Sequence, residues 1–495
     1  MKLCELFRDI PCTWSASYDP DLDVTDLIYD SRRVVPGCAF VCLRGANVDG
    51  HQYAAQAAKA GAAVIIAEES VSVDVPVLLV KDTRETLARL SDVFFGHPAQ
   101  QVKVIGITGT KGKTTTAYMI HAILTAAGYK VGIIGTIGVL IGDTLTPTAN
   151  TTPESYEVQK FLRKMADEGC DFCVMEASSI GLQHYRAYGF LFEAGVFTNF
   201  SEDHIGGNEH KDMEEYLWAK SLLFTRCKKG VVNIDDPSWQ GVTKNHTCTL
   251  TSYGFDPSAD LYAKNDALLS RPGYVGVSYD VCGALNFHAE VDIPGRFSVY
   301  NSLAAIACCR LFDIPVEAMQ KGLDTVKVKG RVEPVEVPGP YTMLIDYAHN
   351  AVSMESILST LREYNPKRLI CLFGAGGNRP KVRRYEMGEV CGRLADLSVI
   401  TSDNCRFEEP QAIIDDIKVG MAKTNGRFIE IVDRREAIRW CLENAQAGDM
   451  IVLAGKGHED YQEICGKKYP FDERVVVREI LDSMKGGESH ADDRS

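Results

Sequence analysis

Short apolar runs rich in β-branched residues alternate with longer amphipathic stretches along most of the chain. Strands that are buried on both faces read as continuous apolar runs, whereas helices that cover a sheet carry one apolar stripe. The alternation therefore predicts an α/β protein in which mostly parallel sheets are covered by helices.

The runs fall into three groups. We expect strands near residues 24–32, 38–44 and 63–67 in the first group, near 102–108, 172–176, 195–200 and 230–234 in the second, and near 343–347, 369–374, 397–402, 428–432 and 450–454 in the third. A length of 495 residues also favours about three domains. The predicted domains are residues 1–100, 101–331 and 332–485, followed by a frayed tail over 486–495.

The charge balance narrows the possible partners. The chain has 53 Lys and Arg residues against 67 Asp and Glu, a formal net charge of -14. Nucleic acids and anionic membranes need a basic surface, so neither is expected as a partner. No stretch reaches the roughly 18 apolar residues of a membrane-spanning helix. We therefore expect a cytoplasmic protein that holds any phosphate ligand locally.

The sharpest local signal is the run VIGITGTKGKTTT at residues 104–116, in which an apolar strand leads through glycines into a helix. Glycines allow backbone N–H groups to approach phosphates, Lys113 can reach the outer phosphates, and the Thr114 hydroxyl can bind Mg²⁺. Ile107 replaces the first glycine of the strict phosphate-loop pattern, which leaves a tight strand-to-helix turn as the alternative. The run predicts a nucleotide site.

Lys220 stands on the apolar side of a predicted helix over residues 213–224. Its helical neighbours are Tyr216, Leu217, Leu223 and Phe224. An ammonium group in such surroundings is costly. Either the side chain extends to water, or its pKa falls and the amine becomes chemically available.

Polar groups follow two further strands of the second domain. Glu176 ends one strand and Ser178 follows it, and 198–199 and 203–204 supply Thr, Asn, Asp and His after the next. Ligands bind at the carboxyl ends of parallel strands, so Glu176 is a candidate Mg²⁺ ligand. The alternative is that these groups are solvated loop ends or helix caps.

In the third domain, polar motifs follow four predicted strands, at residues 346–349, 374–379, 403–406 and 455–459. Strand ends that share one sheet edge form a crevice. Positive charge is contributed there by Arg379, Arg383, Arg384 and Arg406. These arginines indicate a substrate that carries carboxylates, and a solvated basic face is the alternative.

Taken together, these motifs resemble the Mur ligase family over nearly the whole chain. They are GTKGKTTT at 109–116, MEASS at 175–179, DH at 203–204, Lys220, GR at 330–331, DYAHN at 346–350 and GKGHE at 455–459. Within the family, the MurE type is favoured by DSR at 30–32, NTTP at 150–153 and DNxR at 403–406. The resemblance implies a uridine-binding domain, a P-loop-like ATPase domain and a Rossmann-like C-terminal domain.

The resemblance also implies an activity. Similar enzymes use ATP to phosphorylate the D-Glu carboxylate of UDP-MurNAc-L-Ala-D-Glu, and the amine of an amino acid then attacks the acyl phosphate. The expected cofactors are ATP, two Mg²⁺ ions and a CO₂-derived carbamate on Lys220. The implied nucleotide contacts are Gly109, Thr110, Lys111, Gly112, Lys113, Thr114, Thr115, Asn301, Arg331 and Asp346. The implied Mg²⁺ ligands are Thr114, Glu176, His204 and Lys220, and the implied catalytic residues are Lys113, Glu176, His204 and Lys220.

Two further sets of substrate contacts follow from the same resemblance. The UDP-sugar dipeptide is expected on Tyr29, Ser31, Ala46, Asn47, Val48, Asn150, Thr151, Thr152, Ser178, His184 and Arg186. The incoming amino acid is expected on Arg384, Asp403, Asn404, Cys405, Arg406, Gly455 and Glu459. Arg406 favours meso-diaminopimelate over L-lysine, because it can form a bidentate pair with the second carboxylate. Cys405 stands where the family usually has proline.

Three alternatives stay open at this point. The chain could be a divergent paralogue, a ligase of the folylpolyglutamate synthetase type, or a non-catalytic nucleotide-binding subunit. The DSR and DNxR motifs disfavour the second alternative, and the complete set of catalytic residue types disfavours the third. The family expectation for the oligomeric state is a monomer.

Overall fold

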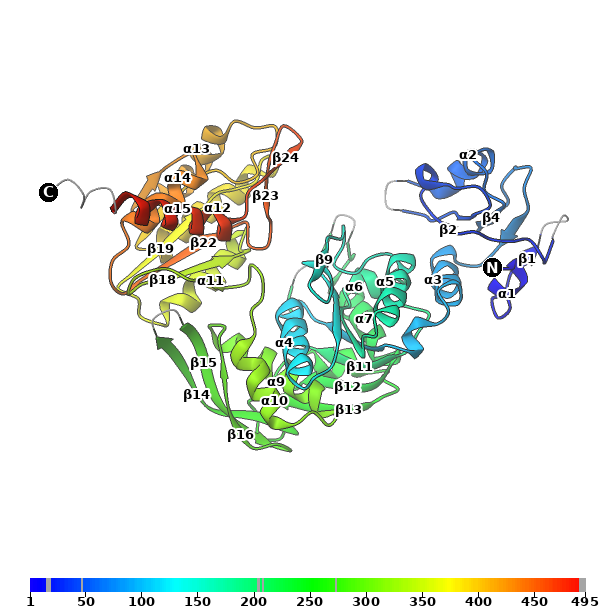
Figure 1. Cartoon of the computed structure of the whole chain (residues 1–495), viewed down its shortest axis with the longest axis horizontal. Helices are drawn as coiled ribbons and strands as arrows, with labels where there is room; N and C mark the ends of the chain where they lie inside the picture. Colours follow the sequence, from blue (N-terminus) through cyan, green and yellow to red (C-terminus); the bar gives the residue numbers. More distant parts are fainter. Residues whose placement is uncertain (15–18, 46–47, 203–204, 207–208, 272–273, 489–495) are drawn as a thin grey trace. The chain divides into compact units, whose positions relative to one another are not determined.

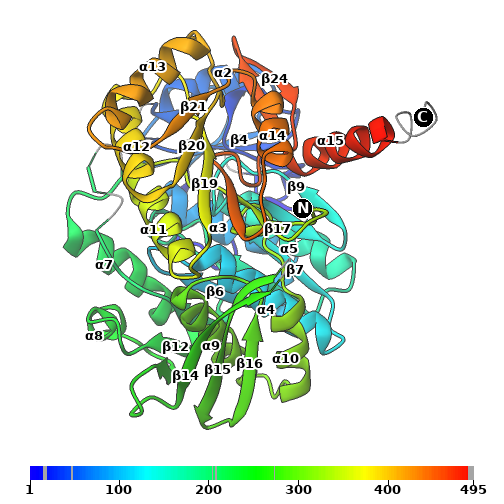
Figure 2. The same cartoon turned by 90° about the vertical axis from the view of Figure 1, so that its left-hand side faces the viewer.

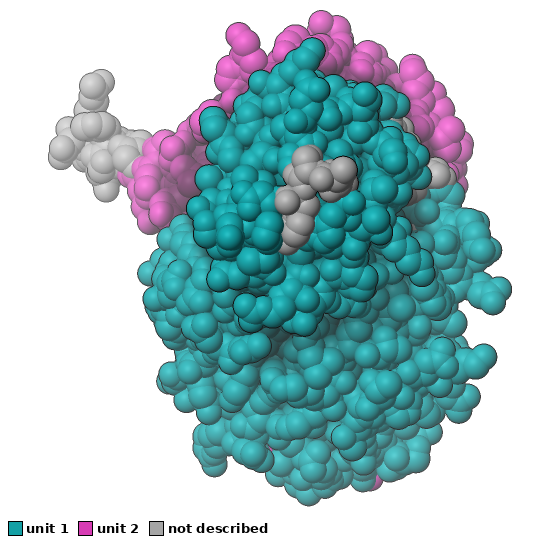
Figure 3. Space-filling view, turned by 90° about the vertical axis from the view of Figure 1, so that its right-hand side faces the viewer, with its two compact units in different colours: residues 1–263, 282–286, 300–322 teal, residues 264–281, 287–299, 323–495 magenta. Residues whose placement is uncertain are grey.

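The computed structural model describes residues 1–14, 19–45, 48–202, 205–206, 209–271 and 274–488. The chain forms two compact units (Figure 3). Unit 1 comprises Met1–Ala263, Cys282–Asn286 and Tyr300–Gly322, and unit 2 comprises Lys264–Val281, Phe287–Val299 and Leu323–Ser495. Within the described ranges, no helix is long and apolar enough to cross a membrane.

Unit 1 begins with a small five-stranded sheet in the order β1-β5-β4-β3-β2. Its strands are β1 (Thr13–Trp14), β2 (Leu27–Ile28), β3 (Ala39–Val41), β4 (Val64–Ala67) and β5 (Val77–Leu79). Alternate strand residues point to opposite faces. One face packs with α1 (Leu3–Leu6) and α3 (Thr83–Phe94), and residues of α2 (Ala54–Lys59) pack on the other (Figure 1).

A larger, mostly parallel sheet follows in unit 1, in the order β13-β12-β11-β6-β10-β7-β8-β9. The parallel strands are β6 (Lys103–Thr108), β7 (Val131–Gly135), β10 (Phe172–Glu176), β11 (Phe192–Phe197), β12 (Cys227–Asn233) and β13 (Thr249–Gly254). The short strands β8 (Gly138–Ile141) and β9 (Thr144–Thr146) add an antiparallel edge. Because β6 lies centrally, the loop that follows it has strand ends on both sides.

Helices connect and cover these strands. They are α4 (Lys113–Ala126), α5 (Ser155–Asp167), α6 (Ser179–Gln183), α7 (Met213–Ser221) with the 3₁₀ turn η4 (Leu222–Thr225), α8 (Trp239–Thr243), α9 (Arg296–Arg310) and α10 (Val316–Thr325). Helix α5 illustrates the packing, because Val158, Leu162 and Met165 recur at helical spacing and join the core beneath β6 and β10.

Three strands that the apolar pattern did not predict extend the large sheet: β14 (Leu261–Arg271), β15 (Tyr274–Gly283) and β16 (Phe287–Val291). Strands β15 and β16 pair antiparallel. Most of β14 beyond Ala263 is exposed, so its sequence has no continuous apolar run. This exposure explains why apolar runs did not reveal the strand.

The sheet of unit 2 has the order β17-β18-β22-β19-β20-β21. Its strands β19, β20 and β21 are labelled in Figure 2. Strands β18 (Thr342–Asp346), β19 (Arg368–Phe373), β20 (Leu397–Ile400), β21 (Phe428–Glu430) and β22 (Asp449–Ala454) are parallel, and β17 (Glu333–Val335) is an antiparallel edge. Helices α11 (Ala351–Arg362), α12 (Lys381–Leu394) and α13 (Pro410–Met421) cover one face, and α14 (Arg434–Glu443) and α15 (Glu473–Glu488) cover the other. A separate hairpin joins β23 (Tyr461–Ile464) to β24 (Lys467–Pro470).

The predicted fold class is confirmed, since both units consist of mostly parallel sheets covered by helices. The predicted domain boundaries stay predictions. Residue 100 lies inside unit 1, and residue 331 follows the last passage between the units at Gly322. Helix α15 continues to Glu488, so the first part of the predicted tail is helical, and 489–495 lie outside the described residues.

Candidate active site

The loop between β6 and α4 depends on two glycines with positive φ. Gly109 has φ +150°, and a Cβ there would lie 1.9 Å from Thr198 Oγ1. Gly112 has φ +85°, and a Cβ there would lie 2.4 Å from Asn301 Oδ1. No other residue type fits these positions without displacing a neighbour. The loop therefore has the strand, glycine and helix context that the sequence predicted.

Two lysines converge on this loop. Lys113 Nζ donates to the carbonyl oxygens of Gly109, at 2.9 Å, and Thr110, at 3.0 Å. Lys220 Nζ donates to the same Gly109 oxygen at 2.8 Å and lies 4.3 Å from the centre of the Tyr216 ring. Only 1% of Lys220 is exposed, so its side chain does not extend to water. The structure thus excludes the alternative in which the Lys220 side chain extends to water.

Residues after β11 hold the loop from the other side. Asn199 accepts at its backbone oxygen from Thr110 N, at 2.8 Å, and at its side-chain oxygen from Lys111 N, at 2.9 Å. The Thr198 hydroxyl donates to Lys111 O at 2.7 Å. These polar residues therefore fix the loop backbone. The predicted His204 lies outside the described residues, as do Ala46 and Asn47.

Glu176 gathers hydroxyl groups at the end of β10. Its Oε2 accepts from Thr114 Oγ1 at 3.0 Å and from Thr136 Oγ1 at 3.1 Å, and its Oε1 accepts from Thr136 N at 2.9 Å. A Cβ at Gly135 would lie 2.2 Å from Glu176 Oε1. Mg²⁺ prefers oxygen ligands at about 2.1 Å in octahedral geometry, which places adjacent ligands about 3 Å apart. The Thr114 and Glu176 oxygens fit such an ion.

The segment before α5 is tied to the same strand end. Thr151 Oγ1 lies 3.0 Å from Thr136 Oγ1, and Thr152 Oγ1 donates to Glu176 O at 2.8 Å and lies 3.0 Å from Ser178 Oγ. Arg186 donates to Thr152 O at 3.3 Å. The structure therefore brings four predicted substrate residues, Thr151, Thr152, Ser178 and Arg186, next to the candidate metal ligands.

Other residues predicted for the UDP-sugar dipeptide are less closely connected. Tyr29 Oη donates to Glu157 Oε1 at 2.7 Å, which links the small sheet to α5. Ser31 begins a 3₁₀ turn, and Asn150 and Val48 are exposed. Burial and the nearby charges of Arg84 and Arg186 lower the pKa of His184. The substrate roles of these residues stay predictions.

Unit 2 contains a cavity of about 160 Å³ at the carboxyl ends of its central strands. It is lined by Tyr347, His349, Ala375, Gly376, Arg379, Arg383, Arg384, Met387, Asp403, Asn404, Arg406, Gly455 and Glu459. Six of the seven residues predicted for the amino acid are among them. The seventh, Cys405, is buried within the same loop.

Arg384 is part of the cavity wall, but carboxylates of the protein engage its guanidinium. Only 1% of the residue is exposed. Its Nη1 donates to Glu408 and Asp416, at 2.8 and 2.9 Å, and its Nη2 donates to the other Glu408 oxygen at 2.7 Å. Arg384 and a backbone N–H lower the pKa of Glu408 to about 2. The arrangement gives Arg384 a structural role in the wall.

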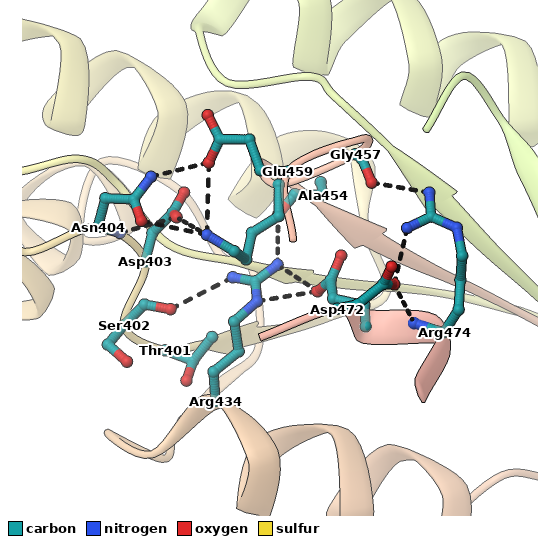
Figure 4. Close-up of polar contacts among 12 residues, drawn as sticks. Thr401, Ser402, Asp403, Asn404, Arg434, Ala454, Gly457, Glu459, Asp472 and Arg474 are labelled. Atoms are coloured by element: carbon teal, nitrogen blue, oxygen red, sulfur yellow. Dashed lines mark hydrogen bonds and ion pairs between the residues drawn. The ribbon is translucent and has the colours of Figure 1, made fainter. Parts of the chain in front are cut away.

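Asp403, Asn404 and Glu459 form a hydrogen-bonded group (Figure 4). Asn404 Nδ2 donates to Glu459 Oε2 at 2.8 Å. The buried Lys456 donates to Asp403 Oδ1 and Asn404 Oδ1, at 3.2 Å each, and to Glu459 Oε2 at 3.4 Å. Burial raises the pKa of Asp403, but the charges of Lys456 and Arg434 outweigh it and hold the pKa below its ordinary value.

Arg406 is held by the β23–β24 hairpin. Its Nε donates to Glu463 Oε2 at 3.1 Å, and its Nη1 donates to Gly377 O at 2.7 Å. Cys465 N donates to Arg406 O at 2.7 Å. The Nε side is therefore occupied by Glu463. Because Nη1 also donates one N–H to Gly377 O, a ligand carboxylate would bind through Nη2 and the second N–H of Nη1.

Arg331, Asp346 and His458 lie near one another, where β18 and β22 end. Asp346 is buried and accepts from Val332 N at 2.9 Å and Ala348 N at 2.7 Å. Burial raises its pKa against the charge of Arg331. Burial and the charges of Arg331 and two other cations lower the pKa of His458 to about 4. The His458 ring is therefore neutral near pH 7.

The sequence analysis missed four residues that hold these groups: Thr136, Lys456, Arg434 and Glu463. Arg434 is 1% exposed and donates to Glu473 Oε1 at 2.9 Å and to Ala454 O at 2.8 Å (Figure 4). Thr136 directly follows β7, and Lys456 lies inside GKGHE, so a search for polar residues after strands would have found both. Nothing local to the sequence distinguishes Arg434 or Glu463.

Comparisons with known proteins agree with this arrangement. The model of the Mur ligase family catalytic domain matches residues 23–95, that of the Mur ligase middle domain matches 107–309, and that of the Mur ligase glutamate ligase domain matches 330–457. The three matches follow one another along the chain. The three-domain α/β architecture is therefore that of these ligases.

Curated relatives match over almost their full length. The chain is 42% identical to a UDP-N-acetylmuramoyl-L-alanyl-D-glutamate–2,6-diaminopimelate ligase of Caldanaerobacter subterraneus subsp. tengcongensis, over 97% of this chain and 99% of the relative. It is 41% identical to the protein of the same name in Clostridium perfringens, over 93% and 95%. A solved structure of a ligase with this name has a TM-score of 0.73 at 30% identity, over 98% and 99%. The chain belongs to the Mur ligase family.

Proposed function

We propose that this protein is an ATP-dependent ligase that joins meso-diaminopimelate to UDP-MurNAc-L-Ala-D-Glu in peptidoglycan synthesis. The observation that carries the proposal is the cavity of unit 2, where four arginines and two carboxylates line one space of about 160 Å³. The phosphate loop of unit 1 supplies the nucleotide half of the reaction. The relatives that match nearly full length favour this function over the alternatives left open by the sequence.

The reaction needs two bond exchanges. An oxygen of the D-Glu γ-carboxylate attacks the γ-phosphorus of ATP, and the bond to ADP breaks. The ammonium group of the amino acid loses a proton, and the resulting amine attacks the acyl carbon. Phosphate and a second proton leave as the amide forms. Catalysis of this kind consists mainly of positioning and neutralising charge.

The nucleotide residues act through the loop and its surroundings. In the proposal, 109–115 cradle the ATP phosphates, and Lys113 turns from its loop carbonyls to the outer phosphates. Asn301, Arg331 and Asp346 complete the nucleotide contacts. Thr114 and Glu176 would hold Mg²⁺, which neutralises phosphate charge when bound.

Lys220 is proposed to carry a carbamate. Its buried position and its hydrogen bond to Gly109 O place its nitrogen beside the phosphate loop. Conversion of the ammonium to a carbamate removes the cost of a buried positive charge and adds oxygen ligands for a second Mg²⁺. His204 is proposed as a further ligand of that ion.

The cavity offers complementary groups to both ends of a diamino acid. Arg379, Arg383 and Arg406 provide positive charge for carboxylates. Within the described chain, Asp403 Oδ2 and Glu459 Oε1 have no hydrogen-bond partner, which leaves them for an ammonium group. meso-Diaminopimelate carries two carboxylates, and L-lysine carries one. We therefore propose meso-diaminopimelate as the amino acid.

The remaining assignments belong to the same proposal. The UDP-sugar dipeptide binds unit 1 through the first-domain residues and the Thr151, Thr152, Ser178 and Arg186 group. The protein acts as a monomer, with domains at 1–100, 101–331 and 332–485.

The decisive experiment measures phosphate release by the purified protein with ATP, Mg²⁺ and UDP-MurNAc-L-Ala-D-Glu. The arms contain meso-diaminopimelate, L-lysine, L-ornithine or no amino acid. Release that depends on meso-diaminopimelate is expected. Release with lysine or ornithine alone would keep the ligase and reject the amino-acid assignment, and absence of release with every amine would reject the proposed function.

A further inference from the structure

Lys456 is a completely buried lysine two residues after the end of β22. Its three hydrogen-bond acceptors are Asp403 Oδ1 at 3.2 Å, Asn404 Oδ1 at 3.2 Å and Glu459 Oε2 at 3.4 Å. An ammonium group has three N–H donors, so this set uses all of them. All three partners line the cavity of unit 2, whereas Lys456 itself does not.

These contacts determine which atoms the cavity presents. Asn404 Oδ1 also accepts from Glu463 N at 2.9 Å, and Asn404 Nδ2 donates to Glu459 Oε2 at 2.8 Å, so the amide has one orientation. Asp403 and Glu459 each direct one oxygen to Lys456. The second oxygen of each carboxylate is then left for a ligand.

We propose that Lys456 is a positioning residue that sets the ammonium-binding oxygens of Asp403 and Glu459 for the incoming amino acid. The inference rests on the proposed function. Lys456 acts through its partners and makes no contact with the substrate. Its effect reaches the carboxylate-binding side as well, because Asn404 Oδ1 accepts from the backbone of Glu463, whose side chain binds Arg406.

The charges in the cavity explain why a cation is needed there. Two carboxylates that converge on one ligand repel each other, which favours protonation of one of them. Burial of Asp403 acts in the same direction, and Lys456 opposes it. With Lys456 in place, the pKa of Asp403 lies below its ordinary value, so this carboxylate stays ionised near neutral pH and can bind an ammonium group.

Substitution of Lys456→Met tests this role by steady-state kinetics. The KM for meso-diaminopimelate is expected to rise at least tenfold, which corresponds to about 1.4 kcal/mol. The KM values for ATP and UDP-MurNAc-L-Ala-D-Glu should stay within about twofold. The acid limb of kcat/KM for the amino acid should move to higher pH, because Asp403 loses the Lys456 charge that lowers its pKa.

Lys468→Met is the matched control. Lys468 lies 3.8 Å from the centre of the Tyr461 ring, and Lys456 lies 5.7 Å from the same ring, but Lys468 is exposed and does not contact the cavity. Its removal should leave all three KM values unchanged. Should Lys456→Met fail to fold, Lys456→Gln replaces it with the same expected results.

The double variant Lys456→Met, Glu459→Gln distinguishes positioning from general support. If Lys456 acts through Glu459, the two losses should not add. The KM of the double variant for the amino acid should then be within about twofold of the KM of the more impaired single variant. Additive losses, or equal increases in all three KM values, would overturn the inference while leaving the ligase intact. A wild-type protein without amino-acid-dependent phosphate release would instead overturn the proposed function.

Discussion

The nucleotide loop of unit 1 and the amino-acid cavity of unit 2 hold their polar groups in different ways. In the loop, backbone carbonyls of Gly109 and Thr110 hold the two lysines, and the loop itself, with Lys113 and Thr114, comes from one short run of sequence. In the cavity, ion pairs between side chains, such as Lys456 with Asp403 and Arg384 with Glu408, fix the wall. A loop that depends on glycine backbone can be recognised from a sequence motif. Side-chain pairs between distant segments cannot.

The largest effect is expected at the loop. Lys220→Ala should lower kcat by at least about 100-fold with little change in the KM for the amino acid, because only the phosphate side loses a charged group. The matched control is Lys228→Ala, which removes an exposed lysine at the surface of β12. Phosphate release measures both variants. Activity near that of the wild type would contradict the proposed carbamate.

A substitution in the cavity should change KM, whereas the loop substitution changes kcat. Arg406→Ala should raise the KM for meso-diaminopimelate about 10- to 100-fold, since bonds to a charged guanidinium contribute about 1.5–3 kcal/mol. The KM for UDP-MurNAc-L-Ala-D-Glu should change less than about twofold. Arg427→Ala, at an exposed arginine of the same unit, is the control. An equal loss for both substrates would count against the assignment of Arg406.

A glycine substitution tests whether ATP binding depends on the backbone conformation of the loop. Gly112→Ala should raise the KM for ATP about tenfold, because alanine at φ +85° is strained and its Cβ would lie 2.4 Å from Asn301 Oδ1. Gly128→Ala is matched in strain, with φ +91°, but a Cβ there has no neighbour within 4 Å. That control should lower stability and leave the KM for ATP unchanged. Identical kinetics of the two variants would show that the loop tolerates a side chain.

The smallest effect concerns His458 and pH. Its pKa is about 4, against an ordinary value of 6.5, because of burial and nearby cations. The unfolded chain therefore binds more protons between these values, and the contribution to stability is complete above pH 6.5 and is lost as pH falls towards 4. In His458→Asn, the thermal unfolding midpoint should therefore fall less steeply than in the wild type as the pH is lowered from 6.5 to 4.5.

The control for this measurement is His288→Asn, at an exposed histidine on β16 that hydrogen-bonds to Asp280. Its midpoint should follow the wild-type pH dependence. A wild-type slope retained in His458→Asn would show that the protonation of other groups governs stability in this range.

The sequence predicted those strands whose burial produces a continuous apolar run. The strand at 172–176 agrees with β10 because it is buried throughout, whereas β14 was missed because most of it is exposed. In the site, Lys113 and Thr114 follow from one motif. Arg434 and Glu473 lie 39 residues apart and meet only in the folded core, so sequence spacing carried no sign of their pairing.

The hairpin that holds Arg406 has a position where a fluorescent label would report on the cavity. Its two-residue turn consists of Cys465, with φ +49°, and Gly466, with φ +74°. Cys465 is exposed, whereas Cys405 on the adjoining loop is buried and its pKa is raised by that burial. In a background with Ser at positions 4, 12 and 282, which removes the other exposed and half-buried cysteines, a thiol-reactive fluorophore would attach at Cys465, whose backbone binds Arg406. The emission of that dye would then follow amino-acid binding in real time, without any assay of turnover.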